Sequence, residues 1–434
     1  MSPTPTPTPV AGPSVRAAFD RMWADLTPLG LDARTGGYRR YAWSREDATL
    51  REWFAGECVA RGLEVVPDRA GNLWAWWGDP DAVRADGRRG GVAIGSHLDS
   101  VPDGGAYDGP LGVVSALAAV DALRAAGLTP AVPLGIACFG DEEGARFGIA
   151  CAGSRILTGV LTTDRAMGLR DAGGTTMADA LQSSGQAPLG PDPDALQRIS
   201  TFVELHVEQG RALADTDLHD QGTSAVAVGS DIWPHGRWRL DVPGRADHAG
   251  TTRLADRDDA MVTYAGLVLA ARRLAESRGC VATTGKVLVA PNGINAIPSS
   301  VTGWLDARGT DEDAVRALVA DLTAEADAVR TTVTQESWTA TTRFDTSLVT
   351  RLAAVVGPGT PVLGTGAGHD AGVLAQHGIP AAMLFVRNPT GISHSPREHA
   401  DPHDCHAGVA ALARVVADLT DASTTPPLTI GAPA

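Results

Sequence analysis

The sequence has 434 residues, of which 44% are hydrophobic and 20% are charged. The length favours two domains, because single hydrophobic cores stop growing at about 250–300 residues. A formal net charge of −15 argues against nucleic acid or an anionic membrane surface as a partner. The five cysteines are scattered and odd in number, which indicates reduced thiols. Because the sequence also shows no signal peptide and no membrane-spanning run, we expect a cytoplasmic protein.

The chain begins with a Pro/Thr-rich stretch, residues 1–14, which cannot bury a core and is expected to be disordered. A helical pattern comes next, and residues 72–79 then read as a strand. We expect the tryptophans of this strand (Trp74, Trp76 and Trp77) to pack in and around the core rather than to form a binding platform.

The stretch Gly91–Gly109 is the most informative part of the sequence. A short apolar strand ends there in a glycine-rich loop that carries metal-type side chains. His97 is a candidate metal ligand, and Asp99 can accept a hydrogen bond from its other ring nitrogen. Asp108 could bridge two metals. Taken alone, the same loop could also be a solvated acidic turn after a strand.

The arrangement of an apolar strand followed by metal-type residues recurs three times. These repeats are 134–139 with Asp141, Glu142 and Glu143, 201–205 with His206, and 381–386 with His394. Three adjacent carboxylates repel one another and favour a bound cation, although acidic residues also suit the first turn of a helix. We prefer the metal interpretation, because another ligand-rich loop precedes them. Ligands collect at the carboxyl ends of strands in an open α/β sheet, so the four loops are expected to converge on one site.

The pattern changes near residue 229, where alternating, half-exposed strands begin. Two amphipathic helices, 258–277 and 311–331, occur among them in the order strand–helix–strand–strand–helix, and Thr310 is the expected N-cap of the second. This order predicts a small α+β domain inserted into a larger α/β domain. The predicted boundaries are 15–228 and 345–434 for the larger domain and 229–344 for the insertion.

Seven motifs occur in order along the chain: GSHLDSVPDGGAYDG, DEEGARFG, ELHVEQG, GRADHAGTT, GINAIPSS, GAGHDAG and GISHSPRE. Together they resemble the hydantoinase/carbamoylase branch of the dinuclear metallopeptidase-like amidohydrolases. That branch includes N-carbamoyl-L-amino-acid hydrolases, β-ureidopropionases and allantoate amidohydrolases. The resemblance covers nearly the whole chain after the Pro/Thr-rich stretch. It implies a zinc-peptidase-like α/β catalytic domain with an inserted ferredoxin-like lid and dimerisation domain.

The resemblance also implies two divalent metal ions in each subunit. His97 and His206 would each hold one metal, Asp108 would bridge the two, and Glu143 with His394 would hold the second metal. Zinc, manganese, cobalt and nickel all suit imidazole and carboxylate ligands, so the ligand set does not select the ion.

By the same resemblance, Glu142 would be the general base that takes a proton from a metal-activated water and passes it to the leaving nitrogen. His248 would stabilise the developing oxyanion. Asn295 and Arg308 would grip a substrate carboxylate, the arginine by bidentate hydrogen bonds. Without the resemblance, Arg308 would be read as a surface arginine and His248 as a turn histidine that caps its own loop.

The remaining implications concern the pocket and the assembly. Gln209 and His369 would line the pocket around a small carboxylate substrate. Relatives form dimers through the inserted domain, so we expect a homodimer in which His248 reaches the active site of the neighbouring chain.

The sequence departs from the family pattern at two places. Asp103 replaces an asparagine that is often found in the first loop. Trp233, Pro234 and His235 fill a stretch that reads Ala-Gly-Gln in many relatives. The second departure bears on the choice of substrate more than on the chemistry.

The expected activity is hydrolysis of the ureido C–N bond of an N-carbamoyl-L-amino acid. Allantoate is the second candidate substrate, and an N-formyl amino acid stays open because it offers the same carboxylate. An aminopeptidase or carboxypeptidase on this fold would fit the EQG and GAGHDAG motifs poorly. Glu142 argues against a non-catalytic metal-dependent binding protein, which has no use for a base beside the metal ligands.

Overall fold

The computed structural model describes residues 12–83, 87–215 and 224–423, and these fall into two compact units. The first unit runs to residue 230 and also contains 343–363 and the chain from 368 onward. The second unit consists of 231–342 and 364–367. The short segment 364–367, which the sequence analysis places in the larger domain, therefore clusters with the second unit instead.

The structure describes only part of the N-terminal stretch that we expected to be disordered. Residues 1–11 of the stretch expected to be disordered lie outside the described residues. Helix α1 (Pro13–Leu26) begins inside that stretch. The prediction of disorder was therefore wrong for residues 13 and 14, which are helical. Proline suits the first helical turn, because its missing N–H would have no partner there.

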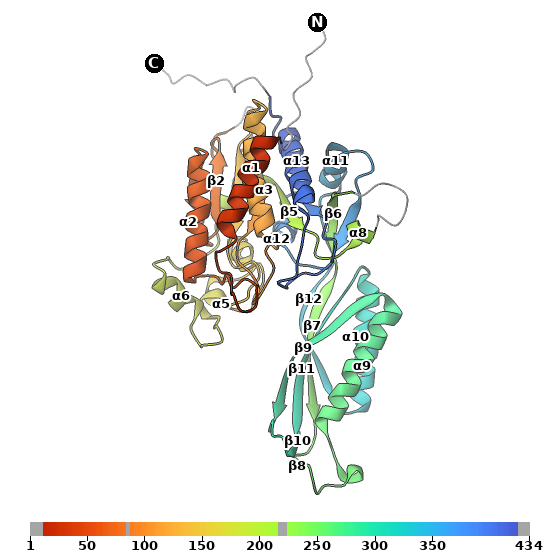
Figure 1. Ribbon diagram of the computed structural model, residues 1–434. Helices are drawn as coiled ribbons and strands as arrows, with labels where there is room; N and C mark the ends of the chain where they lie inside the picture. The colour runs from red at the N-terminus through yellow and green to blue at the C-terminus, as the bar shows by residue number, and fades with distance from the viewer. Residues whose placement is uncertain (1–11, 84–86, 216–223, 424–434) are drawn as a thin grey trace. The chain divides into compact units, whose positions relative to one another are not determined.

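A mixed sheet forms the centre of the first unit (Figure 1). Its strands are β1 (Glu64–Pro67), β2 (Leu73–Trp77), β3 (Gly91–His97), β4 (Leu134–Phe139), β5 (Ile199–Val207), β6 (Val226–Ile232), β13 (Thr342–Arg343), β14 (Val362–Thr365) and β15 (Ala381–Val386). The order across the sheet is β1-β2-β4-β3-β5-β15-β6-β13, and β14 pairs with β6. The four neighbours β4, β3, β5 and β15 run parallel, so their carboxyl ends lie at one edge of the sheet.

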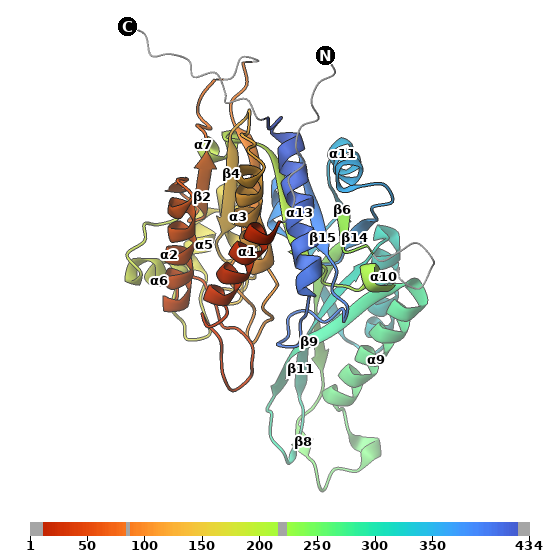
Figure 2. The same ribbon diagram turned by 45° about the horizontal axis from the view of Figure 1, so that its top comes forward.

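Helices pack against this sheet. Besides α1, the helices of the first unit are α2 (Arg45–Ala60), α3 (Pro110–Ala125), α4 (Ala152–Leu157), α5 (Thr163–Gly168), α6 (Met177–Ser183), α7 (Pro193–Gln197), α8 (Ala212–Asp215), α11 (Thr346–Val356), α12 (Asp370–Gln376) and α13 (Pro402–Leu419). Helices α3 and α13 lie side by side (Figure 2). Nearly every residue of α3 is buried, as expected for a helix that is apolar on all sides. Trp74 and Trp76 are buried in β2, which confirms their predicted packing role.

The second unit is a four-stranded antiparallel sheet with two helices. Its elements are β7 (His235–Pro243), β8 (Asp247–His248), the short 3₁₀ helix η2 (Leu254–Asp256), α9 (Ala260–Arg278), β9 (Cys280–Ala290), β10 (Ala296–Ile297), β11 (Ser300–Gly309), α10 (Glu312–Ala328) and β12 (Thr332–Thr339). The main strands and helices follow one another as βαββαβ, and the sheet order is β12-β7-β11-β9. This is the element order of a ferredoxin-like fold.

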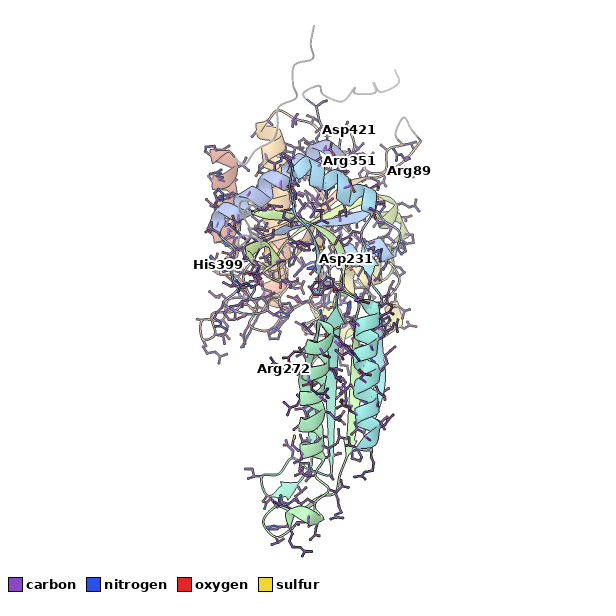
Figure 3. All side chains as sticks on the ribbon, turned by 90° about the vertical axis from the view of Figure 1, so that its right-hand side faces the viewer. Arg89, Asp231, Arg272, Arg351, His399 and Asp421 are labelled. Carbon is purple, nitrogen blue, oxygen red and sulfur yellow. The ribbon has the colours of Figure 1, made fainter. Side chains whose placement is uncertain are left out.

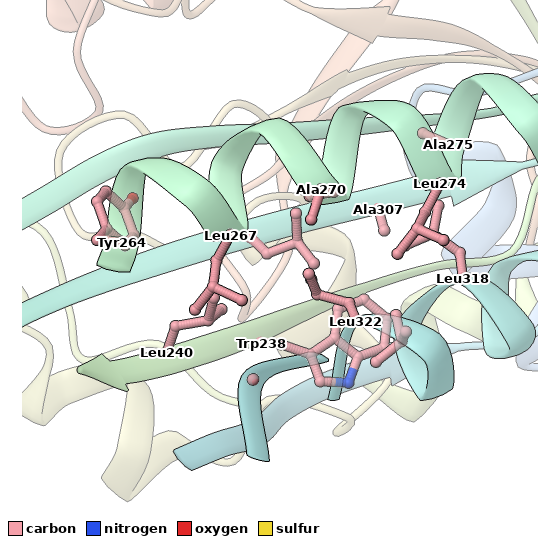
Figure 4. Close-up of a cluster of buried hydrophobic side chains, with 14 of the residues drawn as sticks. Trp238, Leu240, Tyr264, Leu267, Ala270, Leu274, Ala275, Ala307, Leu318 and Leu322 are labelled. Atoms are coloured by element: carbon pink, nitrogen blue, oxygen red, sulfur yellow. The ribbon is translucent and has the colours of Figure 1, made fainter. Parts of the chain in front are cut away.

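The core of the second unit lies between the sheet and the helices (Figure 4). Leu240 of β7, Leu267 of α9 and Leu322 of α10 are among its buried side chains. Two sequence expectations need correction here. The N-cap of α10 is Asp311 rather than Thr310, because the Asp311 carboxylate accepts the N–H groups of the first turn. The last strand, β12, was missed because most of its residues are polar and exposed.

In the described segments, no helix is long and apolar enough to cross a membrane. All five cysteines carry free thiols, and four of them are buried.

Candidate metal centre and active site

The predicted metal ligands lie at the carboxyl edge of the parallel strands. His97 is the last residue of β3, and Glu143 follows the end of β4. His206 is the penultimate residue of β5, and His394 lies in the loop after β15. Because β4, β3, β5 and β15 are neighbours, these side chains meet around Asp108 in the loop between β3 and α3.

The two carboxylate oxygens of Asp108 face different partners. Oδ1 lies 3.2 Å from Nε2 of His206 and 3.6 Å from Nε2 of His97. Oδ2 lies 3.4 Å from Nε2 of His394, which is itself 3.4 Å from Oε2 of Glu143. The ligand atoms thus form two groups that share Asp108, namely His97–Asp108–His206 and Asp108–Glu143–His394.

His97 and His206 both face the same oxygen of Asp108. Strand order explains this grouping, because β3 and β5 are adjacent and parallel. The expected assignment, in which each of these histidines holds one metal, stays a prediction. The two rings have a centroid distance of 5.9 Å.

The tautomers of the two histidines suit metal ligation. Nδ1 of His206 lies 2.9 Å from the carbonyl oxygen of Val207, and Nδ1 of His97 lies 3.2 Å from that of Asp99. A carbonyl can only accept, so Nδ1 carries the proton in the neutral ring and Nε2 presents a lone pair. Neither Nε2 atom has a hydrogen-bond partner among the described residues, although both are buried.

Carboxylates at the centre need a positive partner. Burial, together with the Asp108 charge, raises the pKa of Glu143 to about 7. Burial also raises the pKa of Glu142 well above its ordinary range. Oε1 of Glu143 is buried and has no hydrogen-bond partner in the described part of the chain. Two divalent cations fit this site for three reasons: the imidazole lone pairs face carboxylates, a buried carboxylate oxygen has no partner among the described residues, and the carboxylates together carry a surplus of negative charge.

Asp99 connects the first ligand loop to the turn that carries Glu142. Its carboxylate oxygens accept the backbone N–H groups of Glu142 at 3.1 Å and of Glu143 at 3.0 Å. The distance from its Oδ1 to Nδ1 of His97 is 3.4 Å. The Asp99 carboxylate therefore lies beside the imidazole, but the hydrogen bond from Nδ1 goes to the backbone carbonyl of Asp99 instead of the expected carboxylate. The carboxylate holds the backbone of the Glu142 turn.

Gln209 and His369 lie beside the same cluster. Nε2 of Gln209 donates to Oδ2 of Asp108 at 2.8 Å. His369 is the N-cap residue of α12, and its ring centroid lies 4.5 Å from that of His206. Burial and the neighbouring His206 lower the pKa of His369 well below its ordinary value, which keeps the ring neutral. Both of its buried nitrogens lack a partner within the described segments, as expected of a side chain that serves a ligand.

Glu398 is a buried residue beside the candidate site that the sequence pattern did not predict. Its Oε1 accepts the backbone N–H groups of Tyr107 at 2.8 Å and of Asp108 at 3.0 Å. Ser393 lies between the two carboxylates, at 3.2 Å from Asp108 and 3.3 Å from Glu398. Burial and the Asp108 charge raise the pKa of Glu398 to about 7. The only sequence signal was its place at the end of the GISHSPRE motif.

Two of the expected substrate residues, His248 and Asn295, lie together in the second unit. His248 in β8 pairs with Ala296 in β10, and the carbonyl of Asn295 accepts the N–H of Ala249 at 3.0 Å. The His248 side chain is exposed, and its Nδ1 accepts the N–H of Gly250 at 2.9 Å. The proton of the neutral ring is therefore on Nε2, which makes His248 both a loop cap and an outward-facing donor.

Arg308 lies at the other end of the second unit. At its end of β11, Arg308 pairs with His235 of β7. At the opposite end, Ser300 pairs with Pro243, and the chain continues from Pro243 towards His248. Eight residues of extended strand span about 27 Å. Arg308 and the His248–Asn295 pair of one chain are therefore too far apart to grip the same carboxylate together. The expectation that Asn295 and Arg308 bind one substrate carboxylate stays a prediction.

The guanidinium of Arg308 is held on two sides. Nε and Nη2 donate to the carboxylate of Asp306 at 2.6 and 3.0 Å, and Nη1 donates to the carbonyl of Gly366 at 2.7 Å. Gly366 belongs to the segment 364–367, which packs against Trp233 so closely that a Cβ on Gly364 or Gly366 would approach the indole. The Trp233–His235 departure thus lies around Arg308.

Comparisons with known proteins identify the family of the chain. The model of peptidase family M20/M25/M40 matches residues 93–418. An N-carbamoyl-L-amino acid amidohydrolase of Geobacillus stearothermophilus is 34% identical over 422 residues, which cover 92% of this chain and 97% of that protein. An allantoate amidohydrolase of Escherichia coli (strain K12) is 30% identical over 419 residues, with coverages of 93% and 98%.

Solved structures lead to the same family. A hydantoinase/carbamoylase family amidase from Burkholderia ambifaria has a TM-score of 0.76 at 31% identity, and the alignment covers 94% of this chain and 98% of that one. A second amidase of this family, from Burkholderia vietnamiensis, has a TM-score of 0.79 at 28% identity, with coverages of 94% and 97%. The chain therefore belongs to peptidase family M20/M25/M40 and, within it, to the hydantoinase/carbamoylase branch of amidohydrolases.

Proposed function

We propose that this protein hydrolyses the ureido C–N bond of an N-carbamoyl-L-amino acid and releases the amino acid, carbon dioxide and ammonia. The observation that carries the proposal is the pair of ligand groups that share Asp108, with the buried carboxyl of Glu142 beside them. The choice of substrate is supported by the Geobacillus relative, which is 34% identical, against 30% for the allantoate amidohydrolase.

Two divalent metals would be held by the two ligand groups. His97 and His206 would hold one ion and Glu143 with His394 the other, and Asp108 would contact both. Such ions act as Lewis acids that polarise a carbonyl and make water a better nucleophile.

Glu142 is the proposed general base. Its Oε2 lies 3.8 Å from Nε2 of His97, at the inner side of the ligand cluster. The carboxylate would take a proton from the attacking water, hold it, and deliver it to the departing nitrogen.

Arg308 is the proposed anchor of the substrate carboxylate. A guanidinium has five N–H donors, and three of these are used by Asp306 and Gly366 among the described residues. Because Asp306 takes the Nε–Nη2 side, one N–H on each of Nη1 and Nη2 remains. A carboxylate can accept from both at once, which fixes the orientation of the substrate.

We further propose that each active site combines two chains of a homodimer. His248 and Asn295 would come together from one chain, because they are neighbours in the second unit. Arg308 would serve its own chain, because the carbonyl that it binds lies only three residues before His369. In this arrangement, Nε2–H of His248 would stabilise the developing oxyanion.

The surface of the second unit supports such a dimer. Strand β9 is the edge of its sheet and exposes Val281, Val287 and Leu288. Helix α9 exposes Val262 and Leu269, at 69% and 70%. Arg272 extends from the same helix into solvent (Figure 3). An open edge strand beside exposed apolar side chains is typical of a surface that pairs with a second copy.

A substrate screen tests the proposed activity. The metal-reconstituted enzyme is given N-carbamoyl-L-amino acids, their D-enantiomers, allantoate and N-formyl-L-amino acids, and ammonia and free amine are measured. We expect the highest kcat/KM for an N-carbamoyl-L-amino acid. A higher value for allantoate or for a formyl substrate would overturn the substrate assignment. No turnover of any of them by fully metal-loaded enzyme would overturn the proposed activity itself.

A further inference from the structure

Backbone hydrogen bonds join the turn that carries Glu142 to the start of helix α4. The N–H of Cys151 donates to the carbonyl of Glu142, and the N–H of Ala152 donates to that of Asp141 at 2.9 Å. The N–H of Gly153 donates to the carbonyl of Gly140 at 2.9 Å. These three successive bonds fix the main chain of the turn, but none of them involves the side chain of Glu142.

The thiol of Cys151 contacts the side chain of Glu142. Its Sγ donates to Oε1 of Glu142 at 3.3 Å, and the residue is 3% exposed. The other oxygen of the carboxylate, Oε2, is the one that lies 3.8 Å from Nε2 of His97. The two oxygens are thus divided between the thiol on one side and the ligand cluster on the other.

The backbone of Cys151 makes this placement costly. Its φ of 54° and ψ of 38° lie in the left-handed region, which residues with a Cβ rarely adopt. Glycine would fit the conformation without strain, but it would remove the thiol. Cys138 offers a comparison, because it is equally buried at 3% but makes no hydrogen bond to Glu142 in the described part of the chain.

We propose that Cys151 is a positioning residue for the catalytic base: its S–H binds Oε1 of Glu142 and so directs Oε2 towards the reacting water. The proposal rests on the proposed role of Glu142 as the base. Within the described part of the chain, Cys151 makes no hydrogen bond to any of the proposed metal ligands. Its loss should therefore lower kcat and leave KM and metal content unchanged.

The main experiment compares two substitutions of Cys151. One relieves the backbone strain but removes the hydrogen-bond donor, and the other keeps both the strain and a donor. Cys151→Gly relieves the left-handed strain and removes the thiol, whereas Cys151→Ser keeps a donor in the strained position. We expect the glycine variant to lose about fivefold or more in kcat, the worth of one ordinary hydrogen bond, with KM within about twofold. The serine variant should stay within about twofold of the wild type, and Cys138→Ala should match the wild type.

A purely structural role predicts a different result. Cys151→Gly would then keep its kcat and raise the melting temperature, because the strain is relieved and the hydrogen bond does not matter. That outcome would overturn the proposal, and so would an equal loss of kcat in the glycine and serine variants.

A spectroscopic measurement is independent of turnover. The S–H stretching band of Cys151 is identified by Raman difference between the wild type and Cys151→Ser. Removal of the acceptor by Glu142→Ala should move this band to higher wavenumber, as a thiol does when it loses a hydrogen bond. An unmoved band would exclude the contact.

Failure of this proposal can be told from failure of the proposed function. Glu142→Gln with full metal content and normal turnover would show that Glu142 is not the base. An inactive Glu142→Gln combined with a normal Cys151→Gly would leave the base in place and overturn only the role of the thiol.

Discussion

Co-expression of two inactive variants tests whether each active site is shared between chains. Glu142→Ala and His248→Ala homodimers should both be nearly inactive. Random pairing makes half of the dimers mixed, and in a two-fold dimer each mixed pair has one site that lacks both residues and one site that is whole. About a quarter of wild-type activity per chain should therefore return.

The structure extends this test to two further residues. Asn295 is a neighbour of His248 in the second unit, so Asn295→Ala should also complement Glu142→Ala and restore about a quarter of the activity. Arg308 is bound to a carbonyl three residues before His369 and should serve its own chain. Each site of a mixed dimer of Arg308→Ala with Glu142→Ala then lacks one residue, and no activity should return.

The assay uses two different affinity tags, so that only mixed dimers are purified, and it measures release of amino acid from the N-carbamoyl substrate. Purified mixed dimers of Glu142→Ala and His248→Ala should reach about half of the wild-type activity, because one of two sites is whole. No activity in these dimers would refute a shared site. Recovery in the Arg308→Ala pairing would refute the assignment of that arginine to its own chain.

Three further predictions concern residues within one chain. Glu142→Gln should keep its metal and lose at least ~10²-fold in kcat, whereas Glu143→Gln should lose metal, as measured by elemental analysis. Arg308→Ala should lower kcat/KM by ~10²-fold and abolish the preference for the acid over its uncharged amide. Arg239→Ala, which removes a half-buried arginine paired with Asp241, serves as the control and should change neither. Glu398→Ala removes the acceptor of the Tyr107 and Asp108 backbone N–H groups, so we expect lower metal occupancy and a lower melting temperature; an unchanged metal titration would contradict its supporting role.

Much of the candidate metal centre could be predicted from local sequence alone. Each of His97, His206 and His394 lies at or just after the end of an apolar run, and parallel strands bring such ends to one edge. What the sequence could not show is which residues share a partner. His97 and His206 meet at one oxygen of Asp108 because β3 and β5 are neighbours in the sheet, and strand order is a property of the whole fold.

Supporting residues were harder to predict than ligands. Glu398 lies 290 residues from Asp108 in the chain, and its acidic side chain alone does not distinguish a buried acceptor from a surface carboxylate. Cys151 was read only as one of several reduced thiols. Its contact with Glu142 depends on a left-handed backbone conformation, for which sequence patterns give a signal at glycine but rarely at cysteine.

In the second unit, strand register determines how far apart two of the proposed substrate residues lie. Asn295 and Arg308 are only thirteen positions apart in the chain, and their motifs suggest a joint grip on one carboxylate. Between them, however, β11 runs the length of the sheet, so that one residue lies beside His248 at one end and the other beside His235 at the opposite end. Two residues so separated can act on one small substrate only if they come from different chains. The separation within one chain is thus itself a physical argument for the proposed dimer, and it is independent of the exposed apolar side chains of α9 and β9.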